Sequence, residues 1–511
     1  MKRRIAILLL AFIVGVPCLA HVGSPDVYFQ GDAGPYHLIV VVRTPQMIPG
    51  VASIEIRSAA PGVREVKIVP LYILGAGAKY PPPPDVLKPS KDDAQFFSGK
   101  LWLMASGSWQ VRIEADGDKG AAILSAPVPA FARATMSMQR GLEALLTGLL
   151  ILLVAAIVSI LGAARREGQL ESGGVPAAPQ KRAARITMAA ALAIVLGLLG
   201  MGGWWWKVSA AGRAERMIYR PPQLIVSVLP DGKMLLRVGE SAWHTRRPDA
   251  VSTKLIPDHG HLMHLFLIRV PEMDRFLHLH PRADQGGVFV EDLPPISAGH
   301  YQIFADIVRE SGFPDTLVSE LDIQEIAGAP LVGDDSATSP APLLPSATGN
   351  TSATLSDGSR MIWDRDAAPP AANRLHMFRF HVEGTDGKIA DNLEPYMGIA
   401  GHAEFVRSDL SVFAHVHPDG SASMAAIQLA DASLPGNLPA AVSAEKKSGP
   451  ATEMPGMNMS GGPEAHFSEV VFPYGFPKAG LYRIFVQVKR AGHVETGVFD
   501  VQVNRLPGRI G

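Results

Sequence analysis

Cysteine is almost absent from this chain, whose 511 residues include only Cys18. Cys18 falls in the part that we expect to be removed on export, so the mature chain has no thiol for disulfides or thiolate chemistry. An excess of positive charge is lacking too, because the formal net charge is −1. With no basic stripe, nucleic acid is not an expected partner.

Recognisable catalytic motifs are also missing. The chain has no glycine-rich phosphate loop, no nucleophile elbow around a serine and no His-Glu-x-x-His zinc motif. A copper oxidase would need more copper sites and usually a cysteine ligand for electron transfer. We therefore do not expect an enzyme. An oxygenase that uses a single N-terminal histidine is the remaining possibility of this class.

Long apolar runs occur at three places. Residues 1–20 have a basic start, an apolar stretch and small residues at the end, which predicts a signal peptide cleaved after Ala20. Residues 141–163 and 186–206 are each about twenty residues with almost no charge, enough to cross a membrane. The loop between them, 164–185, is rich in arginine and lysine, which predicts that it lies in the cytoplasm. We expect an inner-membrane protein whose bulk lies in the periplasm or outside.

Strand-like runs separated by Gly and Pro predict a mainly β fold for the exported parts. We expect three immunoglobulin-like β-sandwich domains, at 21–136, 217–325 and 358–504, with the two membrane helices between the first and the second. Residues 327–357 are rich in Pro, Ser, Ala, Thr and Gly, which predicts a flexible linker. The second and third domains form an internal repeat, because SAGHYQIFADIVRESG parallels KAGLYRIFVQVKRAGH.

Histidine is concentrated in this repeat. In DHGHLMHLFLIRVPEMDRFLHLHP, His264 precedes a turn near Pro271–Asp274, and His278 and His280 follow it. Residues two apart in a strand share a face and cross-strand neighbours lie about 5 Å apart, so these three imidazoles should converge. The third domain repeats the pattern with His402, His415 and His417.

Three neutral imidazoles suffice to bind copper, zinc, nickel or iron. His259 and His261 lie in the same stretch, but they have no clear counterpart in the third domain. His21 would be the new N-terminus after cleavage, where its amine and imidazole chelate divalent copper. His466 and Met424 are further candidates. A Pro-, Ser- and Gly-rich insertion in the third domain adds soft thioethers, which select monovalent copper, at Met454, Met457 and Met459. The pattern predicts copper in either oxidation state, with zinc as the second choice.

Two other functions are open. The histidines could be structural, each bonded to backbone carbonyls and water, in a docking module of the cell envelope. Clustered imidazoles also titrate near neutral pH, so they could sense pH. Metal removal distinguishes these functions, because a metal-binding domain gains stability from its ion whereas a docking module does not.

The sequence resembles uncharacterised bacterial membrane proteins with periplasmic heavy-metal-binding β domains. The resemblance is carried by hairpins that end in HLHP and HVHP, each followed by a strand of the type AG-x-Y-x-IF, and most specifically by YMGIAGHAEFVRSDLSVFAHVHPDGSASMA. The chain is more loosely similar to CopC-like and YtkA-like copper carriers. In CopC-like carriers a terminal histidine binds copper, which implies a ligand role for His21. The resemblance implies copper sequestration, delivery or sensing, with another envelope copper protein as a partner.

Overall fold

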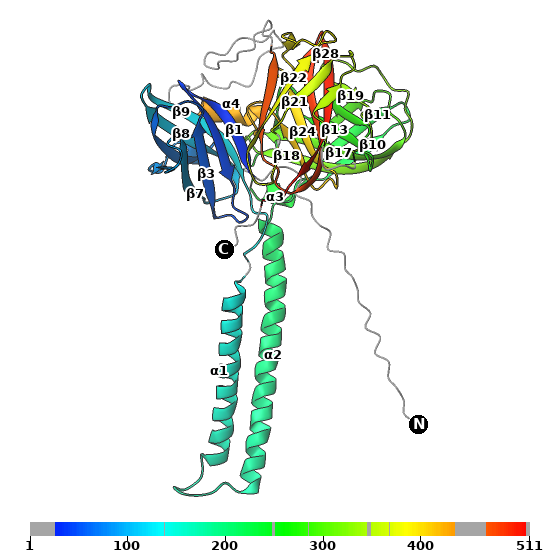
Figure 1. Cartoon of the computed structure of the whole chain (residues 1–511). Helices are drawn as coiled ribbons and strands as arrows, with labels where there is room; N and C mark the ends of the chain where they lie inside the picture. Colours follow the sequence, from blue (N-terminus) through cyan, green and yellow to red (C-terminus); the bar gives the residue numbers. More distant parts are fainter. Residues whose placement is uncertain are drawn as a thin grey trace.

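The computed structural model has three β domains and two long helices that extend from them (Figure 1). It confirms the predicted fold class, mainly β with immunoglobulin-like sandwiches and two apolar helices between the first and second domains. The structure describes residues 26–136, 138–247, 251–284, 286–344, 349–366, 368–434 and 467–506. The predicted signal peptide 1–20 and the candidate ligands His21, Met454, Met457, Met459 and His466 lie outside these ranges.

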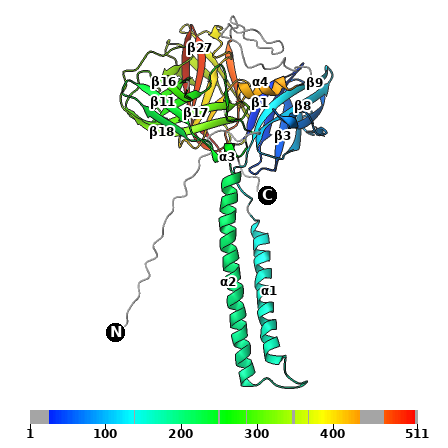
Figure 2. The same ribbon diagram turned by 180° about the vertical axis from the view of Figure 1, so that it is seen from behind.

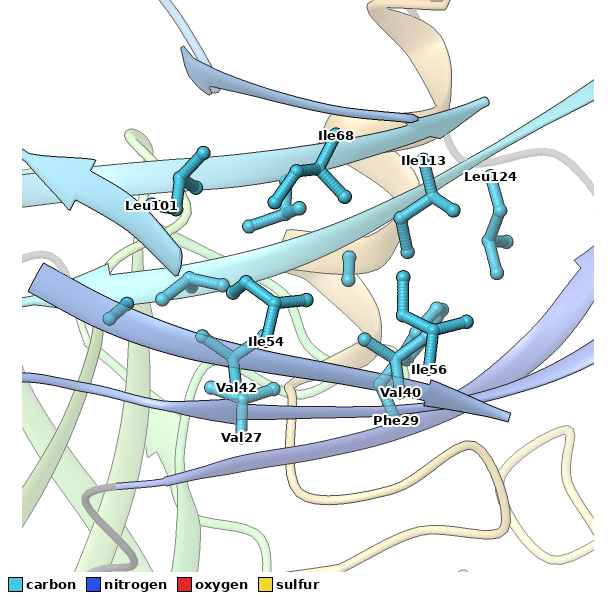
Figure 3. Packing of buried hydrophobic residues seen from close by; sticks show 14 of the residues in the cluster. Val27, Phe29, Val40, Val42, Ile54, Ile56, Ile68, Leu101, Ile113 and Leu124 are labelled. Atoms are coloured by element: carbon cyan, nitrogen blue, oxygen red, sulfur yellow. The ribbon is translucent and has the colours of Figure 1, made fainter. Parts of the chain in front are cut away.

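The first domain packs two antiparallel sheets face to face around one apolar core. Inward-facing residues alternate along the strands, so Ile54 and Ile56 of one sheet meet Ile68 and Ile113 of the other (Figure 3). One sheet consists, in order, of β1 (Val27–Ala33), β2 (Tyr36–Arg43), β3 (Gly50–Ser58), β7 (Phe96–Leu103) and β6 (Lys88–Pro89). The other consists of β5 (Asp85–Val86), β4 (Val63–Tyr72), β8 (Gly107–Gly117) and β9 (Gly120–Ala130).

Helices α1 (Arg140–Glu167) and α2 (Ala178–Met217) contain the two predicted membrane spans. Both are long and apolar enough to cross a membrane. At 1.5 Å per residue α2 is about 60 Å long, roughly twice the thickness of a hydrocarbon core. It is therefore longer than a membrane span needs, and it ends at the β domains (Figures 1 and 2). There Tyr219 N donates to Ala132 O at 2.8 Å, which ties the end of α2 to the chain that leaves the first domain.

The hairpin sheets of the second and third domains have the same strand order, except that the second domain adds β19 at one edge. In the second domain the hairpin sheet contains β12 (Leu255–Ile256), β17 (Gly299–Arg309), β13 (His264–Val270), β14 (Phe276–Leu279) and β19 (Ser336–Thr338), with β18 (Pro314–Ile323) beside β17. In the third it contains β23 (Leu393–Glu394), β27 (Gly480–Arg490), β24 (His402–Arg407) and β25 (Phe413–Val416), with β28 (His493–Val503) beside β27.

A second sheet completes each of these domains. In the second domain it consists of β10 (Leu224–Val228), β11 (Lys233–Val238), β16 (Val288–Asp292) and β15 (Arg282–Ala283), and the short helix α3 (Ala242–Thr245) follows β11. In the third it consists of β20 (Ser352–Thr354), β21 (Arg360–Asp364), β22 (His376–Glu383) and β26 (Glu469–Tyr474), and helix α4 (Met424–Ala432) follows β25.

The predicted linker 327–357 carries more structure than its composition indicated. It contains β19 and β20, and β19 pairs with β14 so that Ser336 lies opposite His278. This segment therefore extends the sheet that holds the histidine hairpin. The prediction of a flexible linker does not describe these two strands.

The second and third domains exchange equivalent contacts across one shared apolar core. Phe276 stacks on Phe485 with ring centroids 4.1 Å apart, and Phe304 stacks on Phe413 at 4.2 Å. The strand registers make Phe276 equivalent to Phe413, and Phe304 equivalent to Phe485. Each domain thus contributes an equivalent pair of phenylalanine rings to the contact with the other domain.

A buried arginine crosses the same interface. Arg483 on β27 donates to both carboxylate oxygens of Asp500, at 2.7 and 2.8 Å. Its remaining nitrogen donates to the carbonyls of Met273 at 2.7 Å and Ala341 at 2.8 Å. Arg483 and Asp500 are almost completely buried, so an ion pair within the third domain holds the guanidinium that bonds the second domain.

The first domain packs against the third. Gln30 N donates to Asp419 O at 2.9 Å, and Ser421 N donates to Tyr28 O at 2.8 Å. Ile427 of α4 is part of the core of the first domain, so α4 closes one side of it. The three β domains therefore form one head above the helices (Figure 2).

Candidate metal centre

The two hairpins place their histidines as the alternation predicts. The β13–β14 register sets His264 opposite His280, and their ring centroids are 5.0 Å apart. His278 shares this face, with its ring 5.4 Å from that of His264. In the other hairpin His402 lies opposite His417 at 5.1 Å. The local geometry of both sites is thus set by strand pairing.

The two hairpins meet at the interface between the domains. Two groups of histidines bring one nitrogen each to within 4.8 Å of one another. We call them the first triad (His264, His278, His280) and the second triad (His259, His402, His417). The second triad combines both domains, because His259 precedes β13. His415 lies between the triads, 5.3 Å from His264 and 5.2 Å from His402 by ring centroids.

Hydrogen bonds fix the tautomers in the first triad. His264 Nε2 lies 3.1 Å from Asp258 O, an acceptor, so this nitrogen carries the proton. His278 Nδ1 lies 2.7 Å from Gln487 Oε1, and the other end of that amide donates to Ser336 Oγ. The ring protons of both histidines are therefore committed to acceptors outside the triad.

The other two nitrogens face each other. His264 Nδ1 and His278 Nε2 are 3.2 Å apart, and each presents a lone pair to the other. His280 Nδ1 donates to Asp335 Oδ1 at 2.9 Å, which leaves a lone pair on its buried Nε2, for which no partner occurs within the described residues. Three lone pairs oriented by outer hydrogen bonds are the arrangement of a metal-binding triad.

The second triad has the same chemistry. His259 Nδ1 donates to Met397 O at 2.9 Å, and His417 Nδ1 donates to Ala422 O at 3.2 Å. The Nε2 atoms of both rings and both nitrogens of His402 are buried without a hydrogen-bond partner in the described part of the chain. Such orphaned nitrogens are costly in a folded protein unless an ion or a water binds them.

Burial keeps these imidazoles neutral. It lowers the pKa of His264, His278, His402 and His417 well below 6.5, and the neighbouring histidines lower it further. The pKa of His415 falls to about 3 for the same reasons, with burial first. Burial therefore disfavours protonation of these imidazoles. The neutral imidazole is the form that binds metals.

Each domain orients a histidine of the other. Gln487 of the third domain accepts from His278 of the second, and Asp306 of the second lies 3.4 Å from Nδ1 of His415 of the third. Gln487 and Asp306 are equivalent, because each pairs across its sheet with the first histidine of its own hairpin. The candidate metal centre thus has its full set of histidines and outer acceptors only when the two domains are docked.

His259 has a structural counterpart that the sequence reading missed. It has a left-handed backbone with φ of 50°, and Gly260 follows. Met397 has φ of 52° and precedes Gly398 in the same turn of the third domain. Both turns stand five residues before the first histidine of their hairpin, which is the signal that could have revealed the match.

His261 and Met424 lie at the edge of the centre. The ring of His261 lies 4.0 Å from that of His280, and its side chain is 29 % exposed. Met424 begins α4, and the next residue, Ala425, donates its backbone N–H to Asp258 Oδ1 at 2.7 Å. The outer acceptors Gln487 and Asp335 were not predicted, since no motif distinguishes an isolated polar residue.

A buried carboxyl accompanies the second triad. Glu404 follows His402 by two residues on β24, so it shares a face with that ring, and it lies opposite His415. It is fully buried, and neither oxygen has a hydrogen-bond partner in the described ranges. Burial, and then the charge of Asp306, raises the pKa of Glu404 well above its ordinary range.

We expect the metal-free protein to lose stability in mild acid. The unfolded chain takes up protons on its histidines below about pH 6.5, but the folded chain does not, because burial lowers their pKa. The free energy of unfolding is highest above pH 6.5, the ordinary pKa of histidine. As the pH falls below that value, the free energy of unfolding decreases by about 1.4 kcal/mol per pH unit for each such histidine. Urea unfolding of chelator-treated protein between about pH 7.5 and pH 5 measures this. A flat profile would contradict buried neutral histidines.

Comparison with known proteins gives little functional information. Residues 353–505 match a domain of unknown function, DUF8832. No curated protein matches the chain. Among solved structures, Salmonella alpha-2-macroglobulin reacted with methylamine is 9 % identical with a TM-score of 0.18, covering 94 % of this chain and 23 % of that one. The chicken CNTN1 FN1–FN3 domains are 7 % identical with a TM-score of 0.12, covering 91 % and 97 %. This chain thus spans about a quarter of the length of the macroglobulin. Neither likeness indicates an activity.

Proposed function

We propose that this protein is a membrane-anchored copper-binding protein that holds its ions between the second and third β domains. The ions would bind in the first and second triads, in the form of neutral imidazole complexes. The function is copper sequestration, delivery or sensing on the outer side of a bacterial inner membrane, in exchange with another envelope copper protein. Zinc is the alternative metal.

One observation carries this proposal. His264 Nδ1 and His278 Nε2 lie 3.2 Å apart while both rings donate their protons elsewhere. Two lone pairs at this distance repel each other unless a cation lies between or beside them. Because burial opposes protonation of both rings, a metal ion is the cation that suits the site.

Copper is favoured over zinc by the rest of the chain. Imidazoles bind both copper states, and the thioethers of Met454, Met457 and Met459 are selective for monovalent copper. The likeness of the hairpins to heavy-metal-binding β domains supports the same metal. No thiolate, the common ligand of structural zinc sites, is present outside residues 1–20.

The distribution of charge supports the proposed side of the membrane. The loop between the helices contains Arg165, Arg166, Lys181, Arg182 and Arg185. Short loops rich in lysine and arginine stay in the cytoplasm, which would leave the three β domains on the opposite side. The basic and apolar pattern of residues 1–20 supports export.

The test is metal content of the full-length protein in lipid nanodiscs. The purified apoprotein is titrated with copper and, separately, with zinc, and bound metal is counted by mass spectrometry after gel filtration. We expect two copper ions per chain, one for each triad. A variant with His278, His280, His415 and His417 all changed to Ala should bind neither.

The matched control changes two exposed histidines, His300→Ala and His493→Ala. It should bind as much copper as the parent. If the parent binds no copper or zinc above background, the histidines are structural and the docking function replaces this one. If the fourfold variant binds as much as the parent, the metal lies elsewhere, for example at His21 or the methionines.

A further inference from the structure

A cavity of about 130 Å³ lies where the three β domains meet. Its wall includes Pro129 of the first domain, Asp306 of the second and Ala426 in α4 of the third. Because a water molecule occupies about 30 Å³ in the liquid, the space suits about four waters or a hydrated metal ion. The fold therefore contains a space of ionic size next to the proposed copper sites.

One end of the cavity reaches the metal centre. His264 of the first triad, His417 of the second and the intervening His415 all line it. The Nε2 atoms of His415 and His417 are buried without a hydrogen-bond partner among the described residues. An ion in the cavity therefore meets ligands of both triads without rearrangement of the strands.

The wall of the cavity is acidic. Four carboxyl groups line it and no lysine or arginine does, within the described chain: Asp26, Asp258, Asp306 and Asp315. Arg309 donates to Asp315 at 2.8 Å and Arg43 pairs with Asp26 at 3.5 Å, so two of these charges are compensated. Asp306 keeps 22 % of its side-chain surface accessible. A wall that has carboxyl groups and no lysine or arginine favours cations over anions.

The wall of the cavity also includes a residue close to the membrane helices, Tyr219. Asp26, Pro129 and Tyr219 all line the cavity, and all three are partly exposed. Tyr219 follows the end of α2 by two residues. This end of α2 meets the head (Figure 2). The cavity thus connects the histidines to the side of the head that faces the membrane.

We propose that this cavity is the passage through which copper reaches and leaves the two triads, with its entrance at the junction of the first domain and α2. The proposal rests on the proposed copper-binding function. It assigns the first domain a role as one wall of the passage. It also sets the direction of exchange toward the membrane surface.

Residue 426 is the place to narrow the passage. A Cβ atom placed on Gly312 would lie 3.2 Å from Ile73 Cδ1 and 3.7 Å from Ala426 Cα, so the three domains are close there. The variants Ala426→Leu and Ala426→Phe add bulk from α4 into the cavity. Gln428→Phe adds the same ring to an exposed position of the same helix and serves as the control.

The experiment measures copper uptake by the full-length apoprotein in nanodiscs by stopped flow, and copper release to a competing chelator. A narrowed passage raises the same barrier in both directions, so uptake and release should both slow by about tenfold or more, while the equilibrium affinity is unchanged. Ala426→Leu should have an intermediate effect, and Gln428→Phe none. The Leu variant keeps the test available if the Phe variant does not fold.

The outcomes separate the two proposals. In one outcome the parent binds copper, but the uptake and release rates of the folded variants do not change with the size of residue 426. That result would contradict the proposed passage but not the proposed copper sites. If Gln428→Phe slows exchange as much as Ala426→Phe, the effect is not steric and the passage is also wrong. A parent that binds no copper overturns the proposed function itself, and the passage with it.

Discussion

Changing His259 to Ala is expected to remove one of two bound metal ions while the fold of both domains persists. His259 is the candidate ligand that the second domain supplies to the second triad, whose other members are in the third domain. Loss of an outer hydrogen bond to a ligand costs roughly 10- to 100-fold in metal affinity, so loss of a ligand should cost at least about a hundredfold. Competition with a chelator of known affinity measures the change.

The control for His259→Ala is His300→Ala. His300 is on β17 of the same domain, its side chain is 42 % exposed, and it bonds Asp322 rather than another histidine. That variant should keep two ions with parental affinities. Two tightly held ions in His259→Ala would show that the second triad does not bind metal through residues of both domains.

Changing Arg483 to Ala is expected to destabilise the head by about 3–5 kcal/mol, the usual cost of removing one partner of a buried ion pair. Asp500 would remain as an uncompensated buried carboxylate, and the carbonyls of Met273 and Ala341 would lose their donor. The urea midpoint of metal-free protein measures the loss. Copper binding should weaken as well, because the metal centre needs both domains in place.

Arg360→Ala is the matched control for this effect. Arg360 pairs with Glu383 within the third domain, but its side chain is 56 % exposed, and exposed pairs contribute only about 0–1 kcal/mol. The double change Arg483→Met with Asp500→Leu removes both charges and should recover much of the stability. Equal urea unfolding midpoints for Arg483→Ala and Arg360→Ala would contradict a stabilising role for the buried Arg483.

The local site was predictable because strand pairing has a period of two. The turn after Val270 and the face shared by His278 and His280 follow from the alternation of apolar residues, and so does the position of His264. The same reasoning holds for the hairpin of the third domain. The membrane helices were equally clear, because their length and lack of charge are properties of single segments.

The shared site was not predictable, because it depends on the docking of two sheets distant in sequence. Gln487 reaches His278 across 209 positions of the chain. A glutamine on an apolar strand has no feature that indicates such a partner. The role of His259 also depends on a left-handed turn whose tip meets the equivalent turn at Met397. The composition of the segment that contains Asp335 indicates a flexible linker and gives no sign of its two short strands.

The exchange of equivalent contacts between the second and third domains has an evolutionary consequence. Surfaces that give each other identical groups, as the paired phenylalanines do, are typical of a symmetric homodimer. The repeat thus has, within one polypeptide, the symmetry of a homodimer, which is the arrangement expected if the gene of a paired subunit were duplicated and fused. Two halves of one polypeptide need not be identical, and here Asp306 stands where the other half has Gln487. A single gene can therefore tune two neighbouring sites separately, which a dimer of identical subunits cannot do.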